Sequence, residues 1–175
     1  MPKQVNVVVT GQMAGRFWSL SPYNPAEGVR GAPKYLVPTY KMSMNDNSPD
    51  FEVIRFGLKR TNITPPPKTR ICDVGLFKQN IYKPSWLPSY RVHSGPGSLP
   101  GAWQLYGSFL IHEGSPSPDD AWGTYGCIEV VGLNEWRRFL ESIKRISGAS
   151  LAEVGHEKLL MVEIKAAAAP TAKLK

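Results

Sequence analysis

A histidine and a cysteine in the stretch from Phe109 to Val131 have the residue types needed for nucleophilic catalysis. Residues 108–111 (SFLI) and 128–131 (IEVV) are short, apolar and partly β-branched, and glycines bound them, which is typical of two strands. The segment between them is rich in Gly, Ser, Pro and Asp and predicts a loop. His112 therefore ends one strand and Cys127 begins the next. If the strands are neighbours, the imidazole and the thiol come together.

Such a pair can carry out acyl transfer. A cysteine thiolate is a nucleophile, and a nearby histidine is the base that generates it or holds it as an ion pair. Gly126 precedes Cys127 and lacks a Cβ, so a substrate carbonyl can approach backbone N–H groups that act as an oxyanion hole. A lone cysteine is more often part of the core. The combination of strand, His, polar loop, Gly-Cys and strand favours catalysis.

In these residues the chain resembles the catalytic domain of the L,D-transpeptidases of the YkuD type. That family has a histidine usually followed closely by Gly, then a loop, then Ser-x-Gly-Cys, an aliphatic residue and usually Arg. The same frame here reads His112-Glu113-Gly114 and Thr124-Tyr125-Gly126-Cys127-Ile128-Glu129, within a resemblance that covers residues 85–147. It implies that Cys127 is the nucleophile and His112 the base, with Gly126 and Tyr125 around the oxyanion hole. Thr124 keeps the hydroxyl of the family's Ser, and Gly114 lies beside the substrate.

Two positions depart from the family pattern. Tyr125 replaces a frequent His, and Glu129 replaces the Arg that is expected to face a substrate carboxylate. Glu129 would repel that carboxylate unless the substrate differs or another cation, Arg91 or Lys83, takes over. His93 is the rival for the role of base and is equally well explained as a structural histidine.

The fold class indicated is mostly β or α+β, in one domain. Sixteen Gly and sixteen Pro in 175 residues favour many turns and short strands. We expect an N-terminal strand and a Pro/Gly-rich arm packed on the core in residues 1–50, the L,D-transpeptidase-like domain in 51–166, and a mobile tail in 167–175. An amphipathic helix follows Cys127, with Asn134 as N-cap and Gly148 after its end.

Other elements are predicted from local patterns. The predicted strands are residues 4–10, ended by Gly11, and residues 15–20, 51–58, 71–77, 86–93, 102–106 and 159–164, with an irregular arm up to Pro38 and a polyproline-like connector at 64–68. Cys72 falls inside a strand and is expected in the core. A Zn²⁺ site from Cys72, Cys127, His93 and His112 is arithmetically possible but lacks paired ligand spacing. We expect two free thiols and no cofactor or metal.

Charge and hydropathy restrict the partners. The net charge of +7 suits an anionic partner, but the basic residues are scattered and no nucleic-acid motif accompanies them. No segment has the roughly 20 apolar residues of a membrane span, and no signal peptide is visible at the N-terminus. We therefore expect synthesis in the cytoplasm. The site of action implied by the resemblance is the periplasm or cell wall, reached by a secretion system or during phage lysis; a secreted toxin would have an immunity protein.

The function indicated is cysteine-dependent acyl transfer, and the resemblance implies that its substrate is the peptide stem of peptidoglycan. Transfer to an amine would give transpeptidation or exchange, and transfer to water would give carboxypeptidase activity. One alternative is a non-catalytic wall-binding or interaction module on the same fold, which the loss of the usual Arg favours. Another is a different Cys/His peptidase or amidase of the papain or NlpC type. Those enzymes place Cys before His at a helix N-terminus, whereas here His112 precedes Cys127 and a strand is expected after Cys127.

Overall fold

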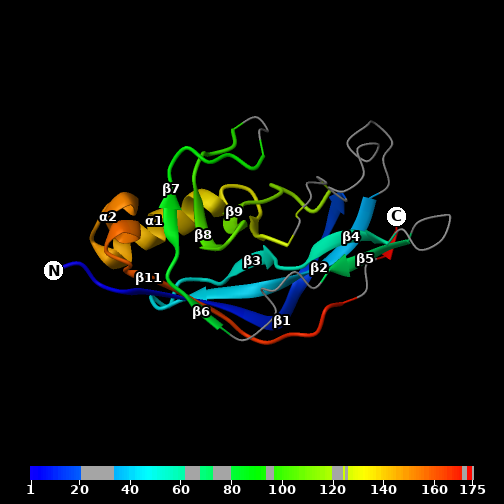
Figure 1. Ribbon diagram of the computed structural model, residues 1–175, viewed down its shortest axis with the longest axis horizontal. Helices are drawn as coiled ribbons and strands as arrows, with labels where there is room; N and C mark the ends of the chain where they lie inside the picture. The colour runs from blue at the N-terminus through cyan, green and yellow to red at the C-terminus, as the bar shows by residue number, and fades with distance from the viewer. Residues whose placement is uncertain are drawn as a thin grey trace.

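The computed structural model describes residues 1–20, 34–61, 68–72, 80–93, 97–119, 124, 126–170 and 173–174. Its main feature is a curled mixed β-sheet in the order β6-β11-β1-β2-β3-β10-β9-β8-β7, with β12 paired to β2 and a separate β4-β5 hairpin. The two helices lie together at the end of the molecule that holds the N-terminus (Figure 1). A mostly β, α+β class is thereby confirmed. The strands are β1 (Val5–Leu20), β2 (Lys34–Met44), β3 (Phe51–Ile54), β4 (Gly57–Thr61), β5 (Lys68–Cys72), β6 (Asn80–Tyr82), β7 (Ser85–Leu87), β8 (Ala102–Tyr106), β9 (Phe109–Glu113), β10 (Ile128–Val131), β11 (Leu160–Ile164) and β12 (Lys173–Leu174).

The two site strands are neighbours, which is the condition under which the sequence places the imidazole and the thiol near each other. β10 pairs in parallel with β9 and antiparallel with β3, so it is flanked on both edges. The parallel ladder extends past both strands, because the Gly114 N–H donates to the Val130 carbonyl and the Gly132 N–H to the Ser115 carbonyl, each at 2.8 Å. We expected His112 at the exit of its strand. It lies within β9, because the strand continues to Glu113.

The N-terminal part of the chain is more regular than the sequence predicts. Gly11 does not end the first strand: β1 continues to Leu20 and pairs with β2 along most of its length, with register shifts between Val9 and Gly15. These irregularities let one strand bend through a glycine-containing segment. Residues 34–38, predicted as the end of the irregular arm, belong to β2, which tolerates Pro38 opposite Arg16.

Two other predicted strands are shorter than expected. The strand predicted at 51–58 is interrupted at Arg55 and Phe56, between β3 and β4. The strand predicted at 86–93 is limited to β7, because the chain turns after Leu87, where the Tyr90 N–H donates to the Leu87 carbonyl at 3.3 Å. Pro88 has no N–H with which to extend the ladder. Residues 90–93 are therefore released from the sheet to form a loop.

The predicted helix is α1 (Glu135–Ser147), and it buries Trp136, Phe139 and Ile143 against the sheet. Phe139 meets Phe51 of β3 edge to face, with ring centroids 5.3 Å apart. Gly148 ends the helix in the left-handed conformation, as predicted. Asn134 lies at the N-cap, but the prediction of its side-chain cap is wrong, because its φ of 62° is left-handed and its side chain makes no capping hydrogen bond.

A second helix, α2 (Leu151–His156), was not predicted. Ser150 and Glu153 form a capping box, in which each side chain bonds the backbone N–H of the other residue, and this S-x-x-E pattern was readable in the sequence. His156, expected in a polar segment, is the last residue of α2. Among the residues described, no helix has both the length and the apolar character needed to cross a bilayer.

Several predictions fall on residues outside those described. They are the connector at 64–67, residues 73–77 of one predicted strand, and Tyr125; Cys72 ends β5. Residues 173–174 of the predicted tail pair with β2 as β12.

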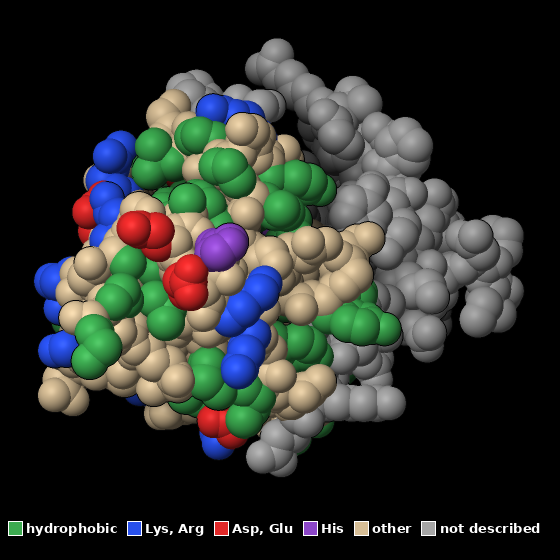
Figure 2. Space-filling view, turned by 60° about the vertical axis from the view of Figure 1, so that its left-hand side comes forward, with side chains coloured by type: hydrophobic (Ala, Val, Ile, Leu, Met, Phe, Trp, Pro, Cys, Tyr) green, Lys and Arg blue, Asp and Glu red, His purple; other side chains and the backbone are tan. Residues whose placement is uncertain are grey.

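On the face with the helical end brought forward, basic and acidic side chains are interspersed with apolar ones (Figure 2). The positive charge is thus dispersed over that face.

Arg55 connects three parts of the fold. Its side chain is 1% exposed, and its guanidinium donates to the Thr10 and Lys165 carbonyls at 2.7 Å each. It also lies over the rings of Tyr40 and Phe56, at 5.6 and 5.1 Å from their centroids. β1, the β3-β4 junction and the segment after β11 are therefore held by one buried cation.

We expect Arg55→Met to lower the free energy of unfolding by about 2 to 4 kcal/mol, because it leaves two buried carbonyls without their charged donor. Urea unfolding followed by circular dichroism measures this. Arg145→Met is the matched control: Arg145 is 60% exposed in its pair with Asp46, so its loss should cost less than about 1 kcal/mol. Equal midpoints for the Arg55 variant and the unmodified protein would contradict this role.

Candidate functional site

The site begins with the register of β9 and β10. His112 is the direct neighbour of Glu129 in the parallel ladder, and Ile111 is the neighbour of Ile128. Because side chains alternate along a strand, the isoleucines face the apolar core while His112 and Glu129 share the opposite face. Both polar residues are buried, with 2% of His112 and none of Glu129 exposed. The sheet thus holds an imidazole and a carboxylate side by side away from water.

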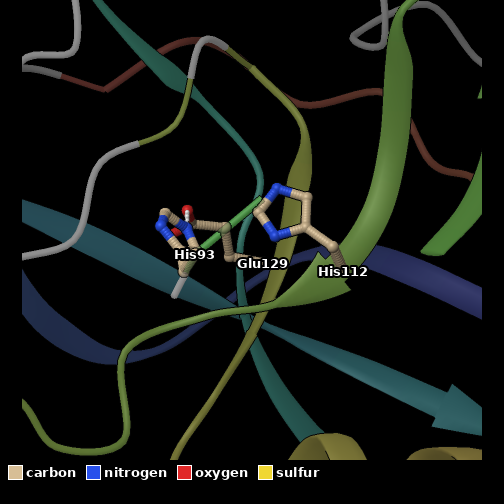
Figure 3. A group of neighbouring side chains, drawn as sticks. All are labelled: His93, His112 and Glu129. Carbon is tan, nitrogen blue, oxygen red and sulfur yellow. Dashed lines mark hydrogen bonds and ion pairs between the residues drawn. The ribbon is translucent and has the colours of Figure 1, made fainter. Parts of the chain in front are cut away.

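His93 completes a compact cluster with these two residues. Its Nε2 lies 2.9 Å from Glu129 Oε1, and its ring centroid lies 5.3 Å from that of His112. One nitrogen of each imidazole and one Glu129 oxygen all lie within 4.8 Å of one another. Figure 3 shows the His112 ring extending from β9 toward Glu129 and His93. His93, with 16% of its side chain exposed, is the member nearest to solvent.

The loop that carries His93 is held by its neighbours. The Leu99 N–H donates to Glu113 Oε2 at 2.9 Å, which ties the loop to the end of β9. Arg91 Nη1 donates to the Ser98 hydroxyl at 2.8 Å and to the Ser98 carbonyl at 3.2 Å. Arg91, predicted as a substrate-binding cation, is thus an exposed side chain that closes this loop.

The hydrogen bonding of His112 determines which of its nitrogens is available. Nδ1 lies 2.7 Å from the Glu113 carbonyl oxygen, which can only accept, so Nδ1 carries a hydrogen. Nε2 is buried and has no hydrogen-bond partner in the described part of the chain. Burial lowers the pKa of His112, although the Glu129 carboxylate and the Glu113 carbonyl oppose this shift. The lowered pKa favours a neutral ring whose Nε2 lone pair is available.

Cys127 lies just before β10 and is partly exposed. Its Sγ is 3.8 Å from the Ser108 carbonyl oxygen, and it is not hydrogen-bonded to His112 Nε2. Burial raises the pKa of the Cys127 thiol and the Glu129 carboxylate adds to this, while hydrogen bonds from the Leu110 backbone and the Thr124 side chain lower it in part. These effects favour a protonated thiol over a thiolate–imidazolium pair.

Thr124 organises the backbone ahead of Cys127. Its hydroxyl donates to the Cys127 carbonyl at 3.2 Å and accepts the Gly126 N–H at 3.1 Å. Thr124 is buried, and Gly126 has a φ of 118°, a conformation that glycine adopts readily. The Gly126 N–H is thus engaged by Thr124 in this conformation and is not free to bind an oxyanion. Tyr125 lies outside the described residues.

Gly114 has a packing role here. A Cβ at this position would lie 2.7 Å from Glu129 Cβ and 2.9 Å from Val131 Cγ1. The absence of a side chain lets the chain after β9 run against β10. Gly114 therefore sets the spacing beneath Glu129.

The structure brings together some of the predicted residues in an arrangement that the sequence did not reveal. His93, His112 and Glu129 form one cluster, whereas Cys127 and Thr124 lie beside it at the entrance to β10. The contact between His93 and Glu129 joins residues 36 positions apart through a loop. Glu129 itself gave the signal, because a carboxylate in the apolar run IEVV requires a buried partner.

Comparison with known proteins gives no match to a family, to a characterised protein or to a solved structure. The function is therefore inferred from the residues and their geometry.

Gly114→Ala tests the close packing under the cluster. The added Cβ must displace Glu129, so we expect stability to fall by about 1 to 3 kcal/mol and the imidazole NMR signals of His93 and His112 to shift. Gly107→Ala is the control without a steric clash: a Cβ there would meet nothing within 4 Å, and its cost comes from the left-handed backbone (φ of 52°), so the imidazole signals should stay unchanged. Unchanged imidazole signals in a folded Gly114→Ala protein would contradict this packing role.

Proposed function

We propose that the protein is a cysteine-dependent acyltransferase or hydrolase that acts on the peptide stems of peptidoglycan, on an L,D-transpeptidase-like fold. One observation supports this most: a partly exposed thiol precedes a strand whose parallel neighbour holds a buried histidine, and the Nε2 of that histidine has no hydrogen-bond partner among the described residues. The nucleophile and the base thus come from adjacent strands, in the order His112 then Cys127 that the family motif requires.

The geometry favours general-base catalysis over a preformed ion pair. In this proposal, Sγ leaves the Ser108 carbonyl and transfers its proton to His112 Nε2 as it attacks the substrate carbonyl. Catalytic hydrogen bonds are often formed only in the substrate complex. The imidazolium then protonates the leaving amine, and an amine or water resolves the thioester. Thr124 is a positioning residue, since its hydroxyl bonds the backbone on both sides of the turn into Cys127.

The position of Glu129 bears on the substrate. Because Glu129 is fully buried and paired with His93, it does not present its charge to an arriving substrate. The repulsion of a stem carboxylate, expected from the exchange of Arg for Glu, is therefore reduced. Arg91 and Lys83 are exposed, and Arg91 is on the loop beside His93. A substrate carboxylate would meet this loop and not Glu129.

Mass spectrometry of purified stem peptides incubated with the protein tests the proposal. We expect shortened or amino-acid-exchanged stems, and we expect Cys127→Ala to abolish them. His112→Gln should slow the reaction by about 10²–10⁴-fold through loss of the base. Shortened stems indicate hydrolysis, and amino-acid-exchanged stems indicate exchange.

His156→Gln is the matched control for the histidine. His156 is 83% exposed on α2 and is paired with Glu157, so its loss should leave the rate unchanged. Unaltered stems with the folded, unmodified protein would refute the enzyme and favour a wall-binding module. Activity that persists in Cys127→Ala would assign the reaction to another nucleophile.

A further inference from the structure

We propose that His93, His112 and Glu129 form a binding site for a divalent transition-metal ion such as Zn²⁺. One nitrogen from each histidine and one carboxylate oxygen lie within 4.8 Å of one another. Adjacent ligands of a tetrahedral zinc ion are about 3.3 Å apart, given bonds of about 2.0–2.1 Å. The three atoms are thus grouped around a volume that rotation of their side chains can close onto one ion.

Two buried atoms of the cluster lack a partner. His112 Nε2 and Glu129 Oε2 make no hydrogen bond in the described residues, although their side chains are 2% and 0% exposed. A buried polar atom without a partner costs free energy. A metal ion would satisfy both atoms, because each offers a lone pair.

The surroundings of His112 suit a metal ligand. Its Nδ1–H donates to the Glu113 carbonyl, and metal-binding histidines commonly donate their second N–H to a carbonyl or carboxylate in this way. That bond fixes the ring and leaves Nε2 as the nitrogen that is available to an ion. His112 is also held on β9 inside the sheet, so its position is set before an ion arrives.

The donor set points to the class of ion. Two imidazoles and one carboxylate favour Zn²⁺ and related ions, whereas Mg²⁺ and Ca²⁺ prefer oxygen ligands. Glu129 offsets one of the two positive charges of the ion. His93 would exchange its 2.9 Å contact with Glu129 for the ion, and its loop is the most exposed side of the cluster.

Metal binding would have a consequence for the reaction proposed above. An ion on His112 Nε2 occupies the lone pair that is needed to deprotonate Cys127. The metal-bound protein would then be inactive, and removal of the ion would restore activity. This consequence rests on the proposed cysteine chemistry, whereas the binding site does not.

Direct binding tests the site. Protein freed of metal is titrated with Zn²⁺ in a calorimeter, and Co²⁺ is added separately to read ligand-field absorption. We expect one ion per chain, no competition by Mg²⁺, and affinity weakened at least about tenfold in Glu129→Gln and in His93→Gln. These two variants preserve shape better than truncation, and thermal unfolding shows whether each is folded.

Two controls distinguish other ligands. His156→Gln should bind Zn²⁺ as the unmodified protein does, since His156 and Glu157 form an exposed pair on α2. Cys127→Ala should also retain binding, because the thiol is not among the three ligands. No binding by the folded protein, or equal affinity in folded Glu129→Gln and His93→Gln, would overturn the site.

The inhibitory role has a separate readout. Stem peptides are incubated with unmodified protein, with Zn²⁺ at saturation or with a chelator, and analysed by mass spectrometry. We expect processing to be lost with Zn²⁺ and regained with the chelator. Full activity at full occupancy would overturn inhibition and leave the site standing. Absence of activity under both conditions would refute the enzyme, while the calorimetric result would still decide the metal site.

Discussion

The parallel pairing of β9 with β10 is the constraint on which the candidate site depends. It makes His112 and Glu129 direct neighbours in a part of the sheet where both edges of β10 are covered. Parallel neighbours cannot be joined by a tight hairpin, so the chain must leave β9, cross a loop and return. That crossover brings Thr124, Gly126 and Cys127 to the start of β10. The placement of the thiol and the burial of the carboxylate therefore both follow from the parallel pairing of β9 with β10.

Burying a carboxylate costs free energy, and the contacts around Glu129 offset part of that cost. Removing an ion from water is offset only by close partners of good geometry. Glu129 has one such partner, His93 at 2.9 Å, supplied by a loop that Glu113 holds through the Leu99 N–H. Its second oxygen has none in the described residues. The cluster is therefore polar and rigid on the sheet side but electrostatically incomplete, and a proton or a cation would complete it.

Local patterns predicted the elements of the site but not their contacts. Apolar runs between glycines identified β9 and β10, and helical spacing with Gly148 identified α1. Gly11 and Pro38 were misread as breaks, because strand pairing is invisible in one segment alone. β1 passes Gly11 in a segment with register shifts, and β2 carries Pro38 in register opposite Arg16. In the sequence, Glu129 stood out because the family motif usually has Arg at this position. Nothing in the sequence indicated that His93 is its partner. His93 reaches Glu129 from the loop that follows the end of β7 at Leu87.

His112 cannot be a base and a metal ligand at the same moment, because both uses need the same Nε2 lone pair. The two states are therefore linked by mass action. At a free ion concentration of about one hundred times the dissociation constant, binding stabilises the metal-bound form by about 2.7 kcal/mol, which leaves about one molecule in a hundred with a free base. The same burial that lowers the pKa of His112, and so suits the proposed base, also favours the neutral ring that a metal ion requires. Glu129 strengthens this competition, since a carboxylate beside the imidazole attracts a cation, whereas an arginine at this position would repel it.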